Sequence, residues 1–259
     1  MKRIIYLLAA VSLVFFQSTA AGAANGYVDF PSFFNSIDSS SVITEFGFSI
    51  FDEDAGYLYS SSASGRINDR LTGSFDACYF SINRDDRIQF GFGDFTINLT
   101  FQASGDSLGT SGIFLRTDIR LPSGAKALQP FASRSFDGGA GMELRDRFSL
   151  FTVRLAGTYT FAEERNAEGI YPHSNYSILA ASAGMDIGPA RLMASGYWVD
   201  YRKSGDRRVL LSSLSGRLSE NFSIILTGGV EAGDDYERLF DSIFSLRLAY
   251  RFPSAENEQ

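Results

Sequence analysis

A strict alternation of apolar and polar residues is the feature that most constrains the fold of this chain. In residues 151–161, FTVRLAGTYTF, one face carries Phe, Val, Leu, Gly, Tyr and Phe, and the other carries Thr, Arg, Ala, Thr and Thr. The same period of two runs through 95–103, 113–121 and 244–252. Successive side chains of a β-strand point to opposite faces, so the pattern indicates strands with one apolar face. Helical spacing is not sustained after residue 24, and the chain is therefore predicted to be all-β.

The alternation predicts twelve strands, and most of the later ones are long. A strand of a globular protein usually has about 5–6 residues, whereas a tilted strand that crosses a membrane needs about 9–11. This length favours a membrane barrel over a soluble antiparallel sandwich, which would also alternate. The predicted strands are 42–50, 56–62, 76–83, 88–103, 110–121, 134–145, 148–161, 174–187, 189–202, 206–218, 220–231 and 241–252. For 174–187 and 189–202 both faces are small or apolar, so the inner face stays unassigned.

The links between the later strands alternate between long and tight. Outer-membrane barrels have this asymmetry, with long extracellular loops, short periplasmic turns and an even number of strands. An open sheet edge in lipid leaves backbone groups unpaired at several kcal/mol each, and closure removes the edges. We therefore predict an antiparallel up-and-down transmembrane β-barrel of about twelve strands over 42–252. Ten or fourteen strands stay open because the first three are weakly patterned. The links are 122–133, 146–147, 162–173, 188, 203–205, 219 and 232–240.

The two ends of the chain are expected to lie outside the barrel. Lys2 and Arg3 precede the mostly apolar residues 4–16, and small residues follow, which is the pattern of a secretory signal peptide over 1–24. We expect export and location in the outer membrane. Residues 25–41 are interpreted as a periplasmic lead-in or a segment inside the lumen, and 253–259 as a polar C-terminal tail.

The charge balance and the motifs exclude several classes of function. Lys and Arg number 23 against 30 Asp and Glu, which gives a net charge of −7. This acidic balance lacks the excess of basic residues that is typical of a protein that binds nucleic acid. The single cysteine, Cys78, excludes an intramolecular disulfide. No phosphate loop, zinc cluster or dinucleotide motif is present, so we expect no cofactor and no metal.

Six charged residues fall on the predicted inner faces of neighbouring strands. A lipid-facing arginine at the midplane of the membrane would cost about 2–4 kcal/mol, so these charges are expected to face the lumen. Two interpretations stay open, namely salt bridges that hold a narrow barrel rigid and a polar constriction that selects solutes. The candidate lumen and selectivity residues are Arg116, Asp118, Arg120, Glu143, Arg145 and Arg154.

An outer-membrane hydrolase is the less favoured alternative. The single histidine, His173, is followed by Ser174 and Asn175, and outer-membrane phospholipases use these residue types. Adjacent residues of an extended segment point in alternate directions, so the three cannot form a catalytic relay by themselves. The acidic pairs at 85–86 and 234–235 are interpreted as solvated loop tips. We therefore predict that the chain is not an enzyme and has no catalytic residue.

Three segments resemble the outer-membrane barrels named after the meta-cleavage pathway of phenol degradation. They are RTDIRLPSG at 116–124, SFDGGAGMEL at 135–144 and the strand at 151–161. In that family a strand ends in a Leu-Pro-Thr/Ser-Gly step, here 121–124, and an Asp/Gly-rich strand follows, here with Asp137, Gly138, Gly139 and Gly141. The similar pattern covers about 90–252, and the tail after Phe252 departs from it. The resemblance implies a transporter of small, often aromatic or hydrophobic compounds, and no catalytic residue carries over.

These patterns predict a passive channel or transporter for small molecules in the outer membrane. The alternative is a structural or surface-contact barrel whose lumen is plugged by its own charges. The expected partners are outer-membrane lipid and lipopolysaccharide, the barrel-assembly machinery and a small-molecule solute, with no nucleic acid.

Overall fold

Thirteen antiparallel strands make up the regular structure of the described residues. The computed structural model describes residues 43–51, 57–84, 87–107, 109–123, 136–162, 175–201, 205–232 and 242–252. No helix in this part of the chain is long and apolar enough to cross a membrane. The strands are β1 (Ile43–Phe51), β2 (Tyr57–Asn68), β3 (Leu71–Arg84), β4 (Arg87–Phe92), β5 (Phe95–Gly105), β6 (Gly112–Leu121), β7 (Asp137–Phe148), β8 (Phe151–Ala162), β9 (Tyr176–Ile187), β10 (Ala190–Tyr201), β11 (Gly205–Arg217), β12 (Phe222–Ala232) and β13 (Ser242–Arg251).

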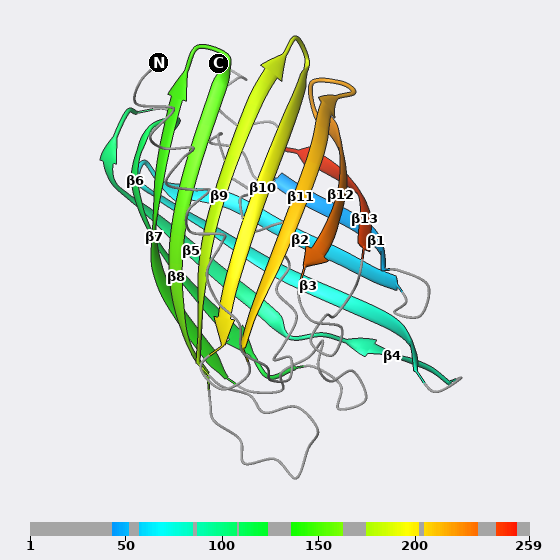
Figure 1. Cartoon of the computed structure of the whole chain (residues 1–259). Coiled ribbons are helices and arrows are strands. Elements are labelled where there is room, and N and C mark those ends of the chain that lie inside the picture. Colours follow the sequence, from blue (N-terminus) through cyan, green and yellow to red (C-terminus); the bar gives the residue numbers. More distant parts are fainter. Residues whose placement is uncertain are drawn as a thin grey trace.

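The strands close into a barrel, as Figure 1 shows. From β5 to β13 each strand pairs with the next, β13 pairs with β1, β1 with β2 and β2 with β3. The strand β3 closes the ring by pairing with β5 over 71–76 and with β4 over 79–84. Since β4 and β5 together fill one place in the wall, the described ring has twelve strand positions. The predicted class and strand count are confirmed.

The predicted strand 88–103 is wrong in one respect, because it is broken into β4 and β5. Gly93 and Asp94 separate the two pieces, and the Gly93 N–H donates to the Cys78 carbonyl at 2.9 Å. A Cβ on Gly93 would overlap the Cys78 sulfur and come within 2.7 Å of the Phe80 ring. The break therefore needs a residue without a side chain.

Two pairs of predicted strand bounds are also corrected. Strands β2 and β3 extend toward each other to a tight turn at 69–70, where the Asn68 side chain accepts the N–H groups of Arg70 and Leu71 at 2.9 Å each. The Gly- and Ser-rich sequence there alternates too weakly to reveal a strand. The predicted strands 134–145 and 148–161 shift to Asp137–Phe148 and Phe151–Ala162.

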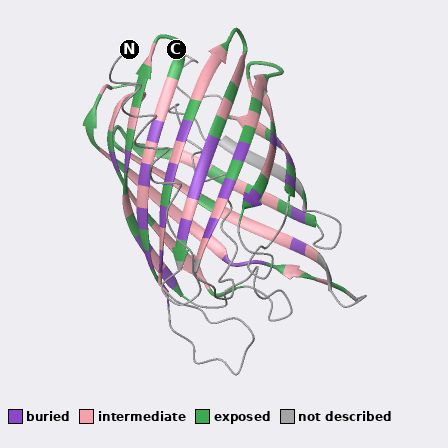
Figure 2. Ribbon diagram, viewed as in Figure 1, coloured by how far each residue is buried: buried purple, intermediate pink, exposed green. Residues whose placement is uncertain are grey.

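The wall has an apolar outer face and a mostly polar inner face. Figure 2 shows buried and exposed residues alternating along the strands. In β8, Phe151, Tyr159 and Phe161 are exposed whereas Arg154 and Thr160 are buried, as predicted. The faces that the sequence left open in β9 and β10 are now assigned. Their buried, inward residues include Tyr176, Ile178, Ala180, Ser182, Ser195, Tyr197 and Val199.

The links between strands differ at the two ends of the barrel. At one end, which we call the tight-turn end, lie 69–70, 106–111, 149–150, 188–189 and 218–221. The opposite end, which we call the long-loop end, is where β1, β3, β6, β8, β10 and β12 end and where β2, β4, β7, β9, β11 and β13 begin. By the strand bounds, the predicted alternation of long and tight links holds from β6 to β10 and fails at 202–204, which is shorter than the next link, 218–221. The signal peptide, the segment 25–41, His173, Ser174, the acidic pairs at 85–86 and 234–235 and the tail 253–259 lie outside the described residues.

The Asp/Gly-rich strand β7 has a steric reason for two of its glycines. Gly139 lies opposite Asp118 on β6, and a Cβ on Gly139 would overlap the Asp118 carboxylate. A Cβ on Gly141 would likewise overlap the backbone carbonyl of Gly157 and the Thr158 residue on β8. Gly138, by contrast, has nothing within 4 Å of its would-be Cβ.

We predict that Gly139→Ala destabilises the barrel and that Gly138→Ala does not. The methyl group at position 139 must displace a carboxylate inside a packed wall, which typically costs about 1–3 kcal/mol. The measurement is denaturant unfolding in detergent micelles, followed by the change in gel mobility between folded and heat-unfolded protein. Equal stability of the two variants would contradict this account of the motif.

Candidate functional site

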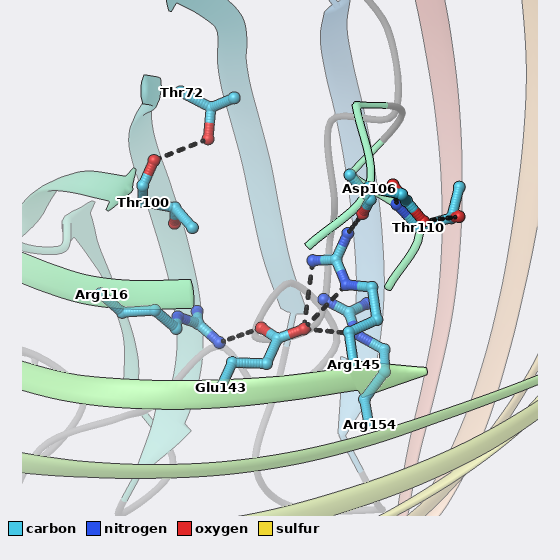
Figure 3. A network of polar contacts seen from close by, with 9 residues as sticks. Thr72, Thr100, Asp106, Thr110, Arg116, Glu143, Arg145 and Arg154 are labelled. Atoms are coloured by element: carbon cyan, nitrogen blue, oxygen red, sulfur yellow. Dashed lines mark hydrogen bonds and ion pairs between the residues drawn. The ribbon is translucent and has the colours of Figure 1, made fainter. Parts of the chain in front are cut away.

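One buried carboxylate gathers three arginines on the inner wall. Glu143 on β7 is 1% exposed, and its Oε1 accepts the Arg154 Nε–H at 2.7 Å and an Arg145 N–H at 3.1 Å. Its Oε2 accepts an Arg116 N–H at 3.3 Å. Figure 3 shows the three guanidinium groups around this carboxylate. We call these four residues the Glu143 cluster.

The sequence places the Glu143 cluster through the register of three strands. Arg145 lies directly opposite Arg154 on β8, and Glu143 lies opposite Phe114 on β6. The Arg145 guanidinium carbon stands 4.4 Å from the centre of the Phe114 ring, a favourable cation–π distance. Like charges opposite each other on a sheet repel, so the carboxylate between the two arginines is what makes this arrangement stable.

A second ion pair lies nearer the long-loop end. The Arg120 Nη1 on β6 is 3.6 Å from the Asp137 Oδ2 on β7, and both side chains are largely buried. Asp118 lies between Arg116 and Arg120 on the same face of β6 and fills the space that Gly139 leaves. All six predicted candidates therefore lie on the inner wall. The structure brings four of them into one cluster and places Arg120 and Asp118 beside Asp137.

Sequence reasoning missed a cluster at the tight-turn end. The Asp186 carboxylate on β9 accepts the Arg191 Nε–H at 2.6 Å and an Arg147 N–H at 2.9 Å. Asp186 and Arg191 lie directly opposite each other across the turn at 188–189, where Gly188 has a φ of 58°. Opposite charges on either side of a Gly-Pro turn are the signal that could have revealed this pair.

A further buried pair joins β11 to β12. The Arg207 Nη2–H donates to the Glu231 Oε2 at 2.6 Å, and its Nε–H donates to the other carboxylate oxygen. Both residues are at most 3% exposed. Removing one partner of a buried ion pair typically costs several kcal/mol of folding stability. This contact therefore stabilises the pairing of β11 with β12.

The turn at 106–111 packs against the Glu143 cluster at the tight-turn end. Its Asp106 carboxylate accepts the Thr110 hydroxyl at 2.6 Å and the N–H groups of Thr110 and Ser111 at 2.9 and 2.8 Å. The hydrogen bond from the Thr110 hydroxyl, the largest cause, lowers the pKa of Asp106 below its ordinary value. Arg145 donates to the Gly109 carbonyl at 2.9 Å, which ties the turn to the cluster.

A pocket opens between these two charged clusters. Two of its arginines, Arg147 and Arg191, are 40% and 33% exposed, whereas Arg145 and Arg154 deeper in the barrel are 8% and 6% exposed. The pocket therefore faces water at the tight-turn end. The residues that line it are Thr110, Arg145, Arg147, Thr152, Arg154, Ser182, Gly184, Arg191 and Met193.

The inner wall near the long-loop end carries packed apolar side chains beside its buried ion pairs. Large side chains there are at most 4% exposed although they point inward, so they do not border open water. They come from β2, β3, β9, β10, β11 and β13. The residues are Leu58, Phe80, Ile178, Tyr197, Val199, Val209 and Ile243.

Of the three residues weighed for hydrolysis, only Asn175 lies in the part of the chain that the structure describes. The Asn175 side chain accepts the Ala162 N–H at 2.9 Å and so bridges β8 to the start of β9. Among the described residues, no three His, Cys, Asp or Glu side chains lie close enough to hold a metal ion.

We predict that Glu143→Gln weakens the barrel by about 3–5 kcal/mol, because three buried guanidinium groups lose their shared negative charge. Asp186→Asn removes the same charge from a more exposed pair of arginines and should cost at most about 1 kcal/mol. Denaturant unfolding of the two variants in the same detergent makes the comparison. A Glu143→Gln barrel as stable as the parent would show that the carboxylate is not holding the arginines together.

We predict that Thr110→Val raises the pKa of Asp106 toward its ordinary value. The lowered pKa means that the ionised carboxylate stabilises the turn above the unfolded pKa near 3.8, and that this stabilisation is lost as the pH falls through the lower folded pKa. The carboxyl carbon resonance of Asp106, followed by NMR against pH in micelles, reports the change. An unchanged titration curve would rule out the hydroxyl as the main cause.

No protein-family profile and no curated protein sequence matches the chain. Similarity to solved structures is clear. The COG4313 outer membrane channel from Pseudomonas putida F1 matches with a TM-score of 0.64 and 12% identity, over 87% of this chain and 100% of that one. The KdgM porin matches with 0.59 and 9%, over 82% and 99%, and the NanC porin with 0.57 and 7%, over 82% and 100%. At these identities the chain shares the fold of outer-membrane channel barrels, and the resemblance to the meta-cleavage-pathway family stays a prediction.

Proposed function

We propose that this protein is a passive channel for small molecules in the outer membrane of a Gram-negative bacterium. The observation that carries the proposal is a closed wall that is apolar outside and encloses a charged pocket open to water. Exposed residues such as Leu115, Leu144, Leu210 and Phe244 suit contact with lipid. Polar groups on the inner wall suit passage of solutes.

Aromatic side chains near both ends of the wall support a membrane location. At the tight-turn end, the ring centres of Phe222 and Tyr250 lie 4.8 Å apart in a tilted pair, and those of Tyr250 and Phe252 lie 4.9 Å apart edge to face. Near the long-loop end, Tyr159 and Phe161 stand 4.8 Å apart on the outer face. Two aromatic girdles are typical of outer-membrane barrels, which place such rings at the two membrane interfaces. The tight-turn end then faces the periplasm, and lipid and lipopolysaccharide surround the wall.

The packed inner residues near the long-loop end favour a second candidate function. If side chains such as Phe80 and Tyr197 fill the lumen at that level, the barrel is closed and serves a structural or surface-contact role. The two candidates differ in whether solutes pass when the barrel is folded. The channel is preferred because a barrel needed only for structure has no use for a water-facing pocket of arginines.

We predict stepwise conductance when the purified, folded protein is inserted into planar lipid bilayers, and swelling of liposomes in small sugars. Phe80→Ala with Tyr197→Ala should raise the single-channel conductance by about twofold or more, because these side chains narrow the apolar level of the lumen. Heat-unfolded protein is the control for insertion, and gel mobility verifies that each sample is folded. A folded barrel that shows neither conductance nor liposome swelling, with or without this double substitution, would favour the structural role.

A further inference from the structure

We propose that the pocket at the tight-turn end is a selectivity site for small organic anions that carry a carboxylate. This inference rests on the proposed channel function and names the class of solute. It goes beyond the polar constriction expected from the sequence because it depends on Arg147 and Arg191, which pattern reasoning did not single out. It also assigns a sign to the charge that the site prefers.

The charge of the pocket favours anions. Four of its nine lining residues are arginines, and none of the nine is acidic. Glu143 pairs with Arg145 and Arg154, and Asp186 pairs with Arg147 and Arg191, but neither carboxylate is among the nine lining residues. The charged groups that line the pocket are therefore all positive, and they lie beside a water-facing opening. Rings of arginine are the usual basis for admitting anions and repelling cations in pores.

The arginines form a path from water into the wall. Arg147 and Arg191 at the rim have the most exposed side chains, and Arg145 and Arg154 follow deeper in. Asp186 holds both rim guanidinium groups through hydrogen bonds, and Glu143 holds both deep ones. An anion that enters from the tight-turn end therefore meets positioned donors first at the rim and then inside.

The donor chemistry suits a carboxylate. A guanidinium is planar and offers two parallel N–H groups, which match the two oxygens of a carboxylate. The hydroxyl groups of Thr152 and Ser182 line the same pocket and can donate to the remaining lone pairs. Met193 is the one lining residue with a large apolar side chain. The pocket thus fits a small polar anion better than a purely apolar solute.

The test compares gluconate with sorbitol, a pair of similar size in which only gluconate has a carboxylate. Rates of liposome swelling in the two solutes give a permeability ratio, and the reversal potential in a KCl gradient gives the anion preference. Arg191→Gln is the test variant. Arg208→Gln is its matched control, since Arg208 lies on the outer face and is paired with Asp206. Both arginine side chains are 33% exposed, so each variant removes one charge from a half-exposed ion pair.

We expect folded parent protein to prefer gluconate and chloride, and Arg191→Gln to lower the gluconate-to-sorbitol ratio by about two- to fivefold, the effect of one partly exposed charge. The double variant Arg147→Gln/Arg191→Gln should lower it further, and Arg208→Gln should leave it unchanged. Passage of both solutes without preference, or equal effects of Arg191→Gln and Arg208→Gln, overturns the anion site and leaves the channel intact.

A binding measurement separates failure of the site from failure of the channel. In micelles, NMR signals of the arginine Nε–H groups should shift when gluconate is added and should not shift with sorbitol. If the folded barrel passes no solute but gluconate shifts these signals in the parent and not in Arg191→Gln, the channel fails and the anion site stands. If gluconate shifts none of them, the site is overturned whatever the conductance.

Discussion

The backbone pairing that closes the ring is the interaction on which every other feature depends. The strand β1 pairs with β2 on one side and with β13 on the other, and β2 pairs with β3, so every described strand except β4 has a partner on both sides. In lipid each unpaired backbone group would cost several kcal/mol. Closure also creates an inside, and only there can arginines and carboxylates meet away from the membrane.

The alternation of the sequence was enough to predict this closed wall, because period two is a direct consequence of strand geometry. It also placed Arg116, Glu143 and Arg154 correctly on the inner face, since their neighbours on either side are apolar or small. Bounds were harder where alternation is weak. The turn at 69–70 lies in a Ser- and Gly-rich stretch, and the break at 93–94 is set by crowding against Cys78 and Phe80.

The contacts within the lumen could be predicted only in part. That Glu143 would be shared by three arginines depends on the register of β6, β7 and β8, and a pattern along one strand does not contain the register. The pair of Asp186 and Arg191 was hidden for another reason. Small residues occupy both faces of β9 and β10, so hydrophobicity gives no sign of which face turns inward.

The pairing of β1 with β13 also has a consequence for how the protein folds. It sets Ile43 opposite Arg251, so the contact joins the two most distant strands of the sequence. The entropy cost of closing a loop grows with its length, whereas hairpins such as β7–β8 and β9–β10 close over two residues each. We therefore expect the hairpins to form before the seam between β1 and β13. Until the seam forms, two strand edges stay exposed, and we expect the finished barrel to open slowly because the whole seam must break.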